Sequence, residues 1–316
     1  MLQLLLVAFG IAGLAIGSNL VVRGALSIAR TFGISPLVVG LTITSIGTSL
    51  PEIATNVAVG ADVLAGIPAS GIAIGNVIGS CLSQITLLLG IAGLAGTLTC
   101  PRRSLRRDGL MLVLALAGMW FASLDGTVSR VEGGVLVLSY IAYLVAVVIL
   151  ERQWEEEDEE EEIVPMPMGR AAIALVVGLV VVTASADLAV ENAVLLASGW
   201  GVGASLIGLM VGVGTGLPEL TVSLQAMRER SGTLGLGNLI GSNITDPLLS
   251  TGLGACVAPF AVPAVALGFD FPFWMAATGV ALLLLFNHLD LNRRESGVLL
   301  IVFGLFVWVR TTLLPL

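Results

Sequence analysis

Long apolar stretches follow one another along most of the chain, and short polar segments separate them. A helix that crosses the hydrocarbon core of a bilayer needs about 20 apolar residues. The apolar residues are continuous within each stretch, which indicates helices and not the alternating strands of a membrane barrel. The pattern predicts an all-α membrane protein with ten transmembrane helices, at 3–30, 35–60, 70–96, 108–124, 131–150, 170–198, 203–228, 233–258, 271–287 and 297–314.

The composition of the chain excludes a soluble fold. Of its 316 residues, 56% are hydrophobic and 11% are charged, and the mean hydropathy is +1.02. A soluble domain usually carries about 25% charged residues, so membrane lipid must surround most of this chain. The three cysteines are isolated, and no nucleophile–base pair or metal motif of known spacing occurs. We therefore expect no enzymatic activity, no cofactor and no nucleic-acid partner.

Arginine is the only basic residue type besides one histidine, and its distribution predicts the orientation of the helices. Most arginines fall at helix ends that share one side of the membrane, and this side is cytoplasmic by the positive-inside rule. Arg130 and Arg310 fall on the other side, and Arg23 lies within the first helix. Both termini are then extracytoplasmic in a multi-pass protein of the cell membrane. The arginines of the crowded side are Arg30, Arg102, Arg103, Arg106, Arg107, Arg152, Arg170, Arg228, Arg230, Arg293 and Arg294.

The ten predicted helices divide into two halves of five around an acidic linker. The first half is 1–150, the linker is 151–168 and the second half is 169–316. Because five is an odd number, the second half enters the membrane from the opposite side, as in the inverted repeats of many transporters. The linker would be cytoplasmic. Its run of acids from Glu155 to Glu162 is interpreted as a solvated tether, because the glycine and spacing of a calcium-binding EF-hand loop are absent.

Two short motifs occur once in each half and in the same order. Gly47 to Glu52 reads GTSLPE and Gly214 to Glu219 reads GTGLPE, which are identical at five of six positions. Gly75 to Ser80 reads GNVIGS and Gly237 to Ser242 reads GNLIGS, again identical at five of six. In each half the first motif lies on the second helix and the other motif on the third. The matches support the prediction of an inverted repeat.

Glu52 and Glu219 lie in the middle of apolar segments, where an ionisable group costs about 2.5–3.5 kcal/mol on insertion scales. Such a residue usually faces a cavity and serves an ion or proton path. The preceding prolines, Pro51 and Pro218, lack an N–H, so the carbonyls four residues earlier lose their helical donors. Each motif therefore offers a carboxylate, carbonyl oxygens and a hydroxyl within about one turn. The alternative is a neutral glutamic acid that forms hydrogen bonds between helices.

The third helix of each half adds further polar side chains. Ser80 and Gln84 are four residues apart, as are Ser242 and Asp246, so each pair shares a helix face. Carboxylate, amide, hydroxyl and carbonyl oxygens are hard ligands, which suit calcium or sodium and not soft metals. The sequence therefore predicts a site for a small hard cation, with ligands from both halves.

The two motif pairs resemble the alpha repeats of the sodium/calcium exchanger family, within the cation/calcium exchanger superfamily, most strongly over about 42–92 and 209–254. The resemblance implies five plus five inverted helices, with Glu52 and Glu219 as central ligands shared by calcium and sodium. The further ligands that it implies are carbonyl oxygens of Thr48 and Thr215, one sodium site with Ser49 and Ser80, a second with Ser242, and a central polar group with Asp246 and Gln84.

Two positions depart from the family pattern. Gly216 stands where the family usually has serine, so one hydroxyl ligand is missing. Gln84 stands where relatives have asparagine or aspartate, and its side chain is longer. A lost sodium ligand favours proton coupling or weaker sodium selectivity, so the counter-ion stays open at this point.

The resemblance implies a secondary active antiporter that exchanges Ca²⁺ for Na⁺ by alternating access, in which the first and sixth helices slide over the motif-bearing core. The alternative in the same fold is a Ca²⁺/H⁺ antiporter, in which protonation of the carboxylates replaces Na⁺ binding. A passive cation channel is a third interpretation. A channel needs a continuous polar pore, however, and here the polar residues concentrate at the middle of the apolar segments.

Overall fold

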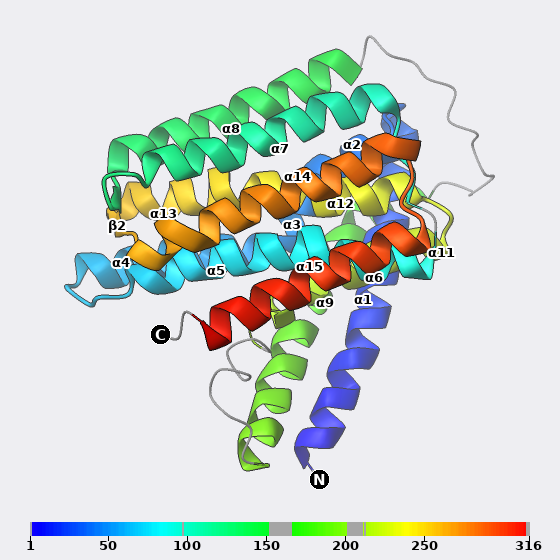
Figure 1. The fold of residues 1–316 in the computed structure, drawn as a ribbon. Helices are drawn as coiled ribbons and strands as arrows, with labels where there is room; N and C mark the ends of the chain where they lie inside the picture. Colours follow the sequence, from blue (N-terminus) through cyan, green and yellow to red (C-terminus); the bar gives the residue numbers. More distant parts are fainter. Residues whose placement is uncertain (1, 97, 152–165, 201–210, 212, 314–316) are drawn as a thin grey trace.

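The structure is a computed structural model that describes residues 2–96, 98–151, 166–200, 211 and 213–313, and most of these residues are helical (Figure 1). The helices of the first half are α1 (Leu2–Phe32), α2 (Pro36–Val39), α3 (Ser45–Thr48), α4 (Leu50–Leu64), α5 (Ser70–Ser83), α6 (Leu89–Ala95), α7 (Arg102–Ala122) and α8 (Arg130–Glu151). Those of the second half are α9 (Met168–Gly199), α11 (Leu217–Arg228), α12 (Gly232–Thr245), α13 (Thr251–Val257), α14 (Phe271–His288) and α15 (Arg293–Thr312).

Short irregular elements connect or interrupt these helices. Four π-helical turns occur in the described ranges: η1 (Gly40–Thr44), η2 (Gln84–Leu88), η3 (Asp246–Ser250) and η4 (Ala266–Asp270). Two strands of two residues each, β1 (Thr127–Val128) and β2 (Phe260–Ala261), pair antiparallel. The hydropathy pattern predicts neither the turns nor the strands, because both depend on local backbone geometry and tertiary contacts.

The described part of every predicted span contains helix, but several boundaries differ from the prediction. The predicted helix 35–60 is broken, and its two parts, Pro36–Thr48 and Leu50–Leu64, are bent by 45°. The fourth helix begins at Arg102 and not at 108, because arginine is a good helix former even where it lowers hydropathy. Residues 203–210 and 212 of the predicted helix 203–228, and the acidic run, lie outside the described residues.

The chain is a multi-pass membrane protein. In the part of the chain that the structure describes, six helices are long and apolar enough to cross a membrane, or seven if the bent pair counts as one span. Helices α7, α11, α12 and α13 fall outside this set. Four of the first six residues of α7 are arginines, and the other three helices are short or rich in polar residues. The ten-span inverted repeat therefore stays a prediction.

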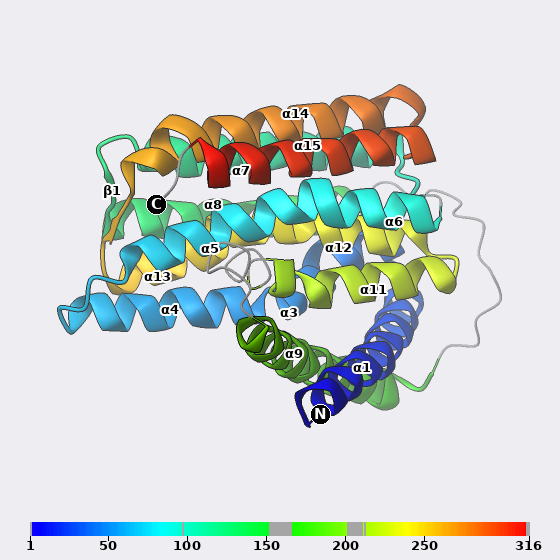
Figure 2. The same ribbon diagram turned by 60° about the horizontal axis from the view of Figure 1, so that its bottom comes forward.

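Helices α1 and α9 form a tightly packed antiparallel pair that projects from the rest of the bundle (Figures 1 and 2). Glycines of α1 allow the close approach. A Cβ atom added at Gly17 would lie 2.6 Å from Cγ2 of Val182, and one added at Gly24 would lie 2.8 Å from the carbonyl oxygen of Ala171. Small residues at a helix interface let backbones approach closely in membranes. The backbones of α1 and α9 therefore lie closer together than large side chains at this interface would allow.

The remaining helices form a core in which the two halves interlock. A Cβ atom added at Gly60 of α4 would lie 2.7 Å from the carbonyl oxygen of Gly254 in α13. Similarly, one added at Gly237 of α12 would lie 2.5 Å from the carbonyl oxygen of Leu37 in α2. Both contacts join the broken second helix of the first half to the third helix of the second half, so motif-bearing segments of the two halves pack against each other.

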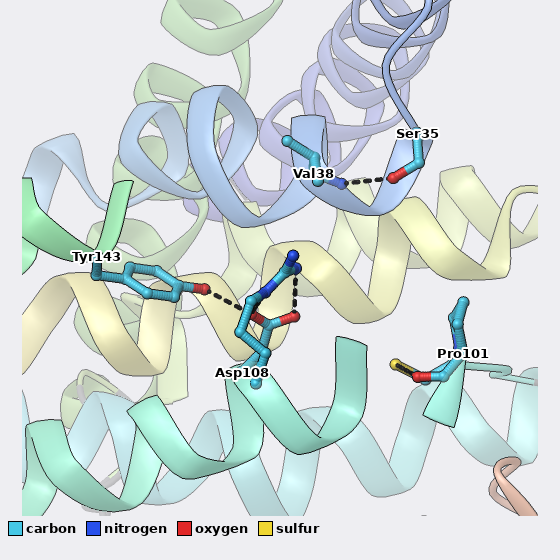
Figure 3. Close-up of polar contacts among 7 residues, drawn as sticks. Ser35, Val38, Pro101, Asp108 and Tyr143 are labelled. Atoms are coloured by element: carbon cyan, nitrogen blue, oxygen red, sulfur yellow. Dashed lines mark hydrogen bonds and ion pairs between the residues drawn. The ribbon is translucent and has the colours of Figure 1, made fainter. Parts of the chain in front are cut away.

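A buried carboxylate joins α7 to α8 at the end of the core near the start of α7. Asp108 accepts hydrogen bonds from the guanidinium of Arg107, at 2.7 and 2.9 Å, and from the hydroxyl of Tyr143 at 3.2 Å (Figure 3). Removal of one partner from such a buried charged group is costly. This contact joins α7 to α8, and none of its three residues belongs to the predicted cation ligands.

Candidate cation site

Glu52 and Glu219 lie in the first turns of two helices that begin within the core, α4 and α11. Each of these helices has a proline in the same turn, Pro51 or Pro218, where the missing N–H does not interrupt the helical hydrogen bonds. The positive end of the helix dipole favours a negative charge in this turn. The same local sequence therefore places one carboxylate in the first turn of a helix that begins within the core in each half.

Gln84 and Asp246 begin the two π-helical turns η2 and η3, at matching positions of the two halves. Such turns are rare and concentrate at functional sites. In the second half the hydroxyl of Thr251 donates to the backbone carbonyl of Asp246, at 3.2 Å. Gln84 follows Ser80 by four residues, and Asp246 follows Ser242 by the same interval. The first residue of each π-turn therefore lies about one helical turn beyond the motif serine and belongs to the candidate site.

The carboxylate oxygens of the two glutamates have no hydrogen-bond partner among the described residues. Glu52 is 1% exposed and Glu219 is 0% exposed, and all their oxygens are buried. The hydroxyls of Ser49 and Ser242 and one oxygen of Asp246, Oδ1, are buried without a partner as well. Leaving a buried polar group unsatisfied costs about 1–3 kcal/mol, and more for a charged group. Such a set of oxygens fits a bound cation.

The three acids lie near one another. The charges of Glu52 and Glu219 interact with each other and with that of Asp246. The hydroxyls of Thr48 and Ser242 lie beside the carboxylate of Glu219. In the described ranges the acids do not form a compact metal-binding cluster by themselves, so a cation held here would also need hydroxyl and carbonyl oxygens.

The structure buries eight of the nine predicted ligand residues together in the core and leaves the ninth, Thr215, half-buried. Three of them contact one another directly. Ser80 Oγ donates to Asp246 Oδ2 at 3.1 Å, and Gln84 Nε2 lies 3.4 Å from the same oxygen. The eight buried residues are Thr48, Ser49, Glu52, Ser80, Gln84, Glu219, Ser242 and Asp246.

Three further buried polar residues line this region and are absent from the predicted set. Asn243 donates to Gln84, and Asn56 donates to the hydroxyl of Ser250 at 2.8 Å across the two halves. Asn56 lies four residues after Glu52, and Asn243 directly follows the second motif, so polarity within an apolar helix is the signal that marks both. Ser250 carries no comparable signal, because serine is common in membrane helices.

A cavity of about 640 Å³ lies between α1, α9 and α11. Its wall is mostly apolar and includes Leu14, Val190, Gly214 and Leu217. Gly214 begins the motif that ends at Glu219, so the cavity reaches the chain segment that carries this glutamate. The arrangement provides space next to the candidate site on the face covered by α1 and α9.

Two helices that begin within the core with a buried glutamate, π-turns at matching positions, and carboxylates without a partner among the described residues are typical of a membrane transporter for cations. The family model described as sodium/calcium exchanger protein matches residues 2–149 and 170–312, which is most of the chain. The chain therefore belongs to the sodium/calcium exchanger family, whose activity is Na⁺/Ca²⁺ exchange and not enzymatic catalysis. This confirms the family that the motifs predict.

Individual relatives agree with this assignment. CaxA of Alkalimonas amylolytica is 35% identical over 300 residues, which cover 89% of this chain and 90% of that protein. The sodium/calcium exchanger MaX1 of Methanosarcina acetivorans is 28% identical over 345 residues, 96% of this chain and 97% of that one. A structure of the sodium-calcium exchanger NCX_Mj soaked with Na⁺ and Sr²⁺ is 29% identical, with a TM-score of 0.82 and 98% coverage of both chains.

Proposed function

We propose that this protein is an antiporter that exchanges Ca²⁺ for Na⁺ at a site shared by Glu52 and Glu219. One observation carries the proposal: both carboxylates are buried, come from different halves of the chain, and have no hydrogen-bond partner among the described residues. Two uncompensated carboxylates in a membrane core are costly. A divalent cation would neutralise both charges, and so would monovalent cations bound in its place.

The ligand set that we propose consists of hard oxygen atoms only. Calcium takes six to eight such oxygens in flexible geometry, and the carboxylates of the three acids would provide part of this set. Buried hydroxyls and the backbone carbonyl oxygens of Thr48 and Thr215 would complete the coordination. The proposed ligand residues are Thr48, Ser49, Glu52, Ser80, Thr215, Glu219, Ser242 and Asp246.

Sharing of the two glutamates explains why transport would be an exchange. If the same carboxylates bind either one Ca²⁺ or Na⁺ ions, the two substrates cannot be bound there together. Loading one therefore requires release of the other, and each crossing carries one kind of cation. In a Ca²⁺/H⁺ antiporter, protons would take the place of Na⁺ on the same oxygens.

Alternating access would be a movement of the α1–α9 pair over the core. The close packing within this pair and the cavity between the pair and α11 support such a movement as a unit. We place the protein in the cell membrane, with ten spans in two inverted halves, 1–150 and 169–316. Both termini would be extracytoplasmic and the linker 151–168 cytoplasmic, as the arginine distribution predicts.

Proteoliposomes that contain the purified protein test this proposal. Isotopic Ca²⁺ uptake should depend on an outward Na⁺ gradient and persist when the pH gradient is collapsed. Uptake driven by a pH gradient without Na⁺ would instead assign proton coupling. Uptake that needs no counter-gradient at all would indicate a channel and contradict the antiporter.

A further inference from the structure

A chain of amide hydrogen bonds links the backbone of α12 to Asp246 by way of the other half of the protein. Asn243 Nδ2 donates to the carbonyl oxygen of Leu239 at 3.1 Å and to Gln84 Oε1 at 2.9 Å. Gln84 Nε2 in turn lies 3.4 Å from Asp246 Oδ2. The Asn243, Gln84 and Asp246 side chains are 0% exposed, so water does not compete for these bonds.

The two ends of this chain fix the direction of both amides. A backbone carbonyl only accepts hydrogen bonds, so the Asn243 atom that faces Leu239 must be the nitrogen. That nitrogen requires an acceptor, so Gln84 presents its oxygen to it. The Gln84 amide nitrogen then faces the carboxylate of Asp246, which also accepts. Turning either amide around would bring two acceptors, or two donors, face to face.

We propose that Asn243 is a positioning residue that holds Gln84 as a hydrogen-bond donor to Asp246, so that Gln84 supplies no oxygen to the transported cation. This inference rests on the proposed function and changes the role predicted for Gln84. Oδ2 of Asp246 accepts from Ser80 and Gln84, and Oδ1 has no partner among the described residues. Asp246 therefore offers one oxygen to a cation.

The repeat explains why the side chain at position 84 is long. In the repeat, Cys81 of the first half matches Asn243 of the second, and Gln84 matches Asp246. The contact of Asn243 with Gln84 therefore has a counterpart in the contact of Cys81 with Asp246. Cys81 Sγ lies 3.8 Å from Asp246 Oδ2, and a thiol is a weak donor. The extra methylene of Gln84 brings an amide donor to the same oxygen, so this oxygen is occupied by hydrogen bonds.

The two roles predict opposite effects on Ca²⁺ affinity, measured by calorimetric titration of the purified protein. Gln84→Met has a similar length and no donor, so it should free Asp246 Oδ2 and raise Ca²⁺ affinity about threefold to tenfold, because a charge-assisted hydrogen bond no longer competes with the cation. Asn243→Leu should act in the same direction. The double variant should not exceed the stronger single variant, since both changes break one chain.

Lower Ca²⁺ affinity in Gln84→Met would mean that Gln84 is a cation ligand and would overturn the proposal. Unchanged affinity in Gln84→Met, or additive effects in the double variant, would overturn it as well. If Asn243→Leu does not fold, the sign for Gln84→Met alone decides. Thr86→Val, a buried change two residues further along the same helix, is the matched control and should keep the wild-type affinity. Failure of the wild-type protein to bind Ca²⁺ at all would count against the proposed function instead.

Discussion

Replacing Gly216 with serine should restore a hydroxyl beside Glu219 and strengthen Na⁺ binding. Gly216 occupies the position in the second half that Ser49 occupies in the first. Its backbone has φ −84° and ψ 3°, which a serine adopts without strain. The absence of a side chain at this position is therefore not required by the backbone, and the substitution tests what the missing hydroxyl contributes.

The structure also shows the steric cost of adding a side chain at position 216, which opposes the gain from the hydroxyl. A Cβ atom at position 216 would lie 2.9 Å from Cδ2 of Leu88, and its next neighbour, the carbonyl oxygen of Val213, would be 3.6 Å away. One terminal methyl group must move, which places the cost near the low end of overpacking, about 1 kcal/mol. A hydroxyl oxygen on a cation should contribute at least as much as a hydrogen bond to a charged group, about 1.5 kcal/mol, or roughly tenfold in affinity.

Gly216→Ala separates these two effects, because it adds the same Cβ atom without the hydroxyl. Both variants should lower the unfolding temperature in detergent by a similar amount. Only Gly216→Ser should reduce, by about threefold to tenfold, the Na⁺ concentration that half-activates Ca²⁺ uptake into proteoliposomes. Equal Na⁺ dependence in the two variants would refute the idea that position 216 faces a bound Na⁺.

Three other results are expected. Asn56→Val leaves its partner hydroxyl on η3 buried and unpaired, which should lower the free energy of unfolding by about 1–3 kcal/mol, measured by chemical denaturation in detergent. Gly17→Leu collides with the backbone of α9 and should abolish transport, whereas Gly134→Leu on α8 meets open space and should retain it, as flux assays would check. Burial raises the pKa of Cys100 to about 12, so its thiol stays protonated at pH 8. A maleimide should then modify the exposed Cys256 first, and labelling of Cys100 should accelerate only at higher pH, followed by mass spectrometry.

The sequence predicts the helical membrane fold and most of the buried site, because both depend on signals that are local in the chain. Glu52 and Glu219 stand out as acids in apolar helices, and the structure places both in first turns within the core. Helix ends are less predictable where charge lies inside a helix. Arg102 starts α7 although hydropathy alone places that start later.

The direction of the Gln84 amide could not be predicted from the motifs. Spacing on one helix shows that Gln84 and Ser80 share a face, but the atom that Gln84 presents to Asp246 depends on Asn243 in the other half. The π-turns that begin at Gln84 and Asp246 also leave no signature in the hydropathy pattern. These features arise from contacts between halves, which no single segment encodes.

Equilibrium binding of radioactive Ca²⁺ to the purified protein tests most directly whether the two halves share one cation. The account predicts one high-affinity Ca²⁺ per chain, lost in Glu52→Gln and lost equally in Glu219→Gln. Asp62→Asn, an exposed change on the same helix as Glu52, should leave binding intact. If either glutamine variant kept half of the bound Ca²⁺ at unchanged affinity, each half would hold its own cation, and the shared site would be contradicted.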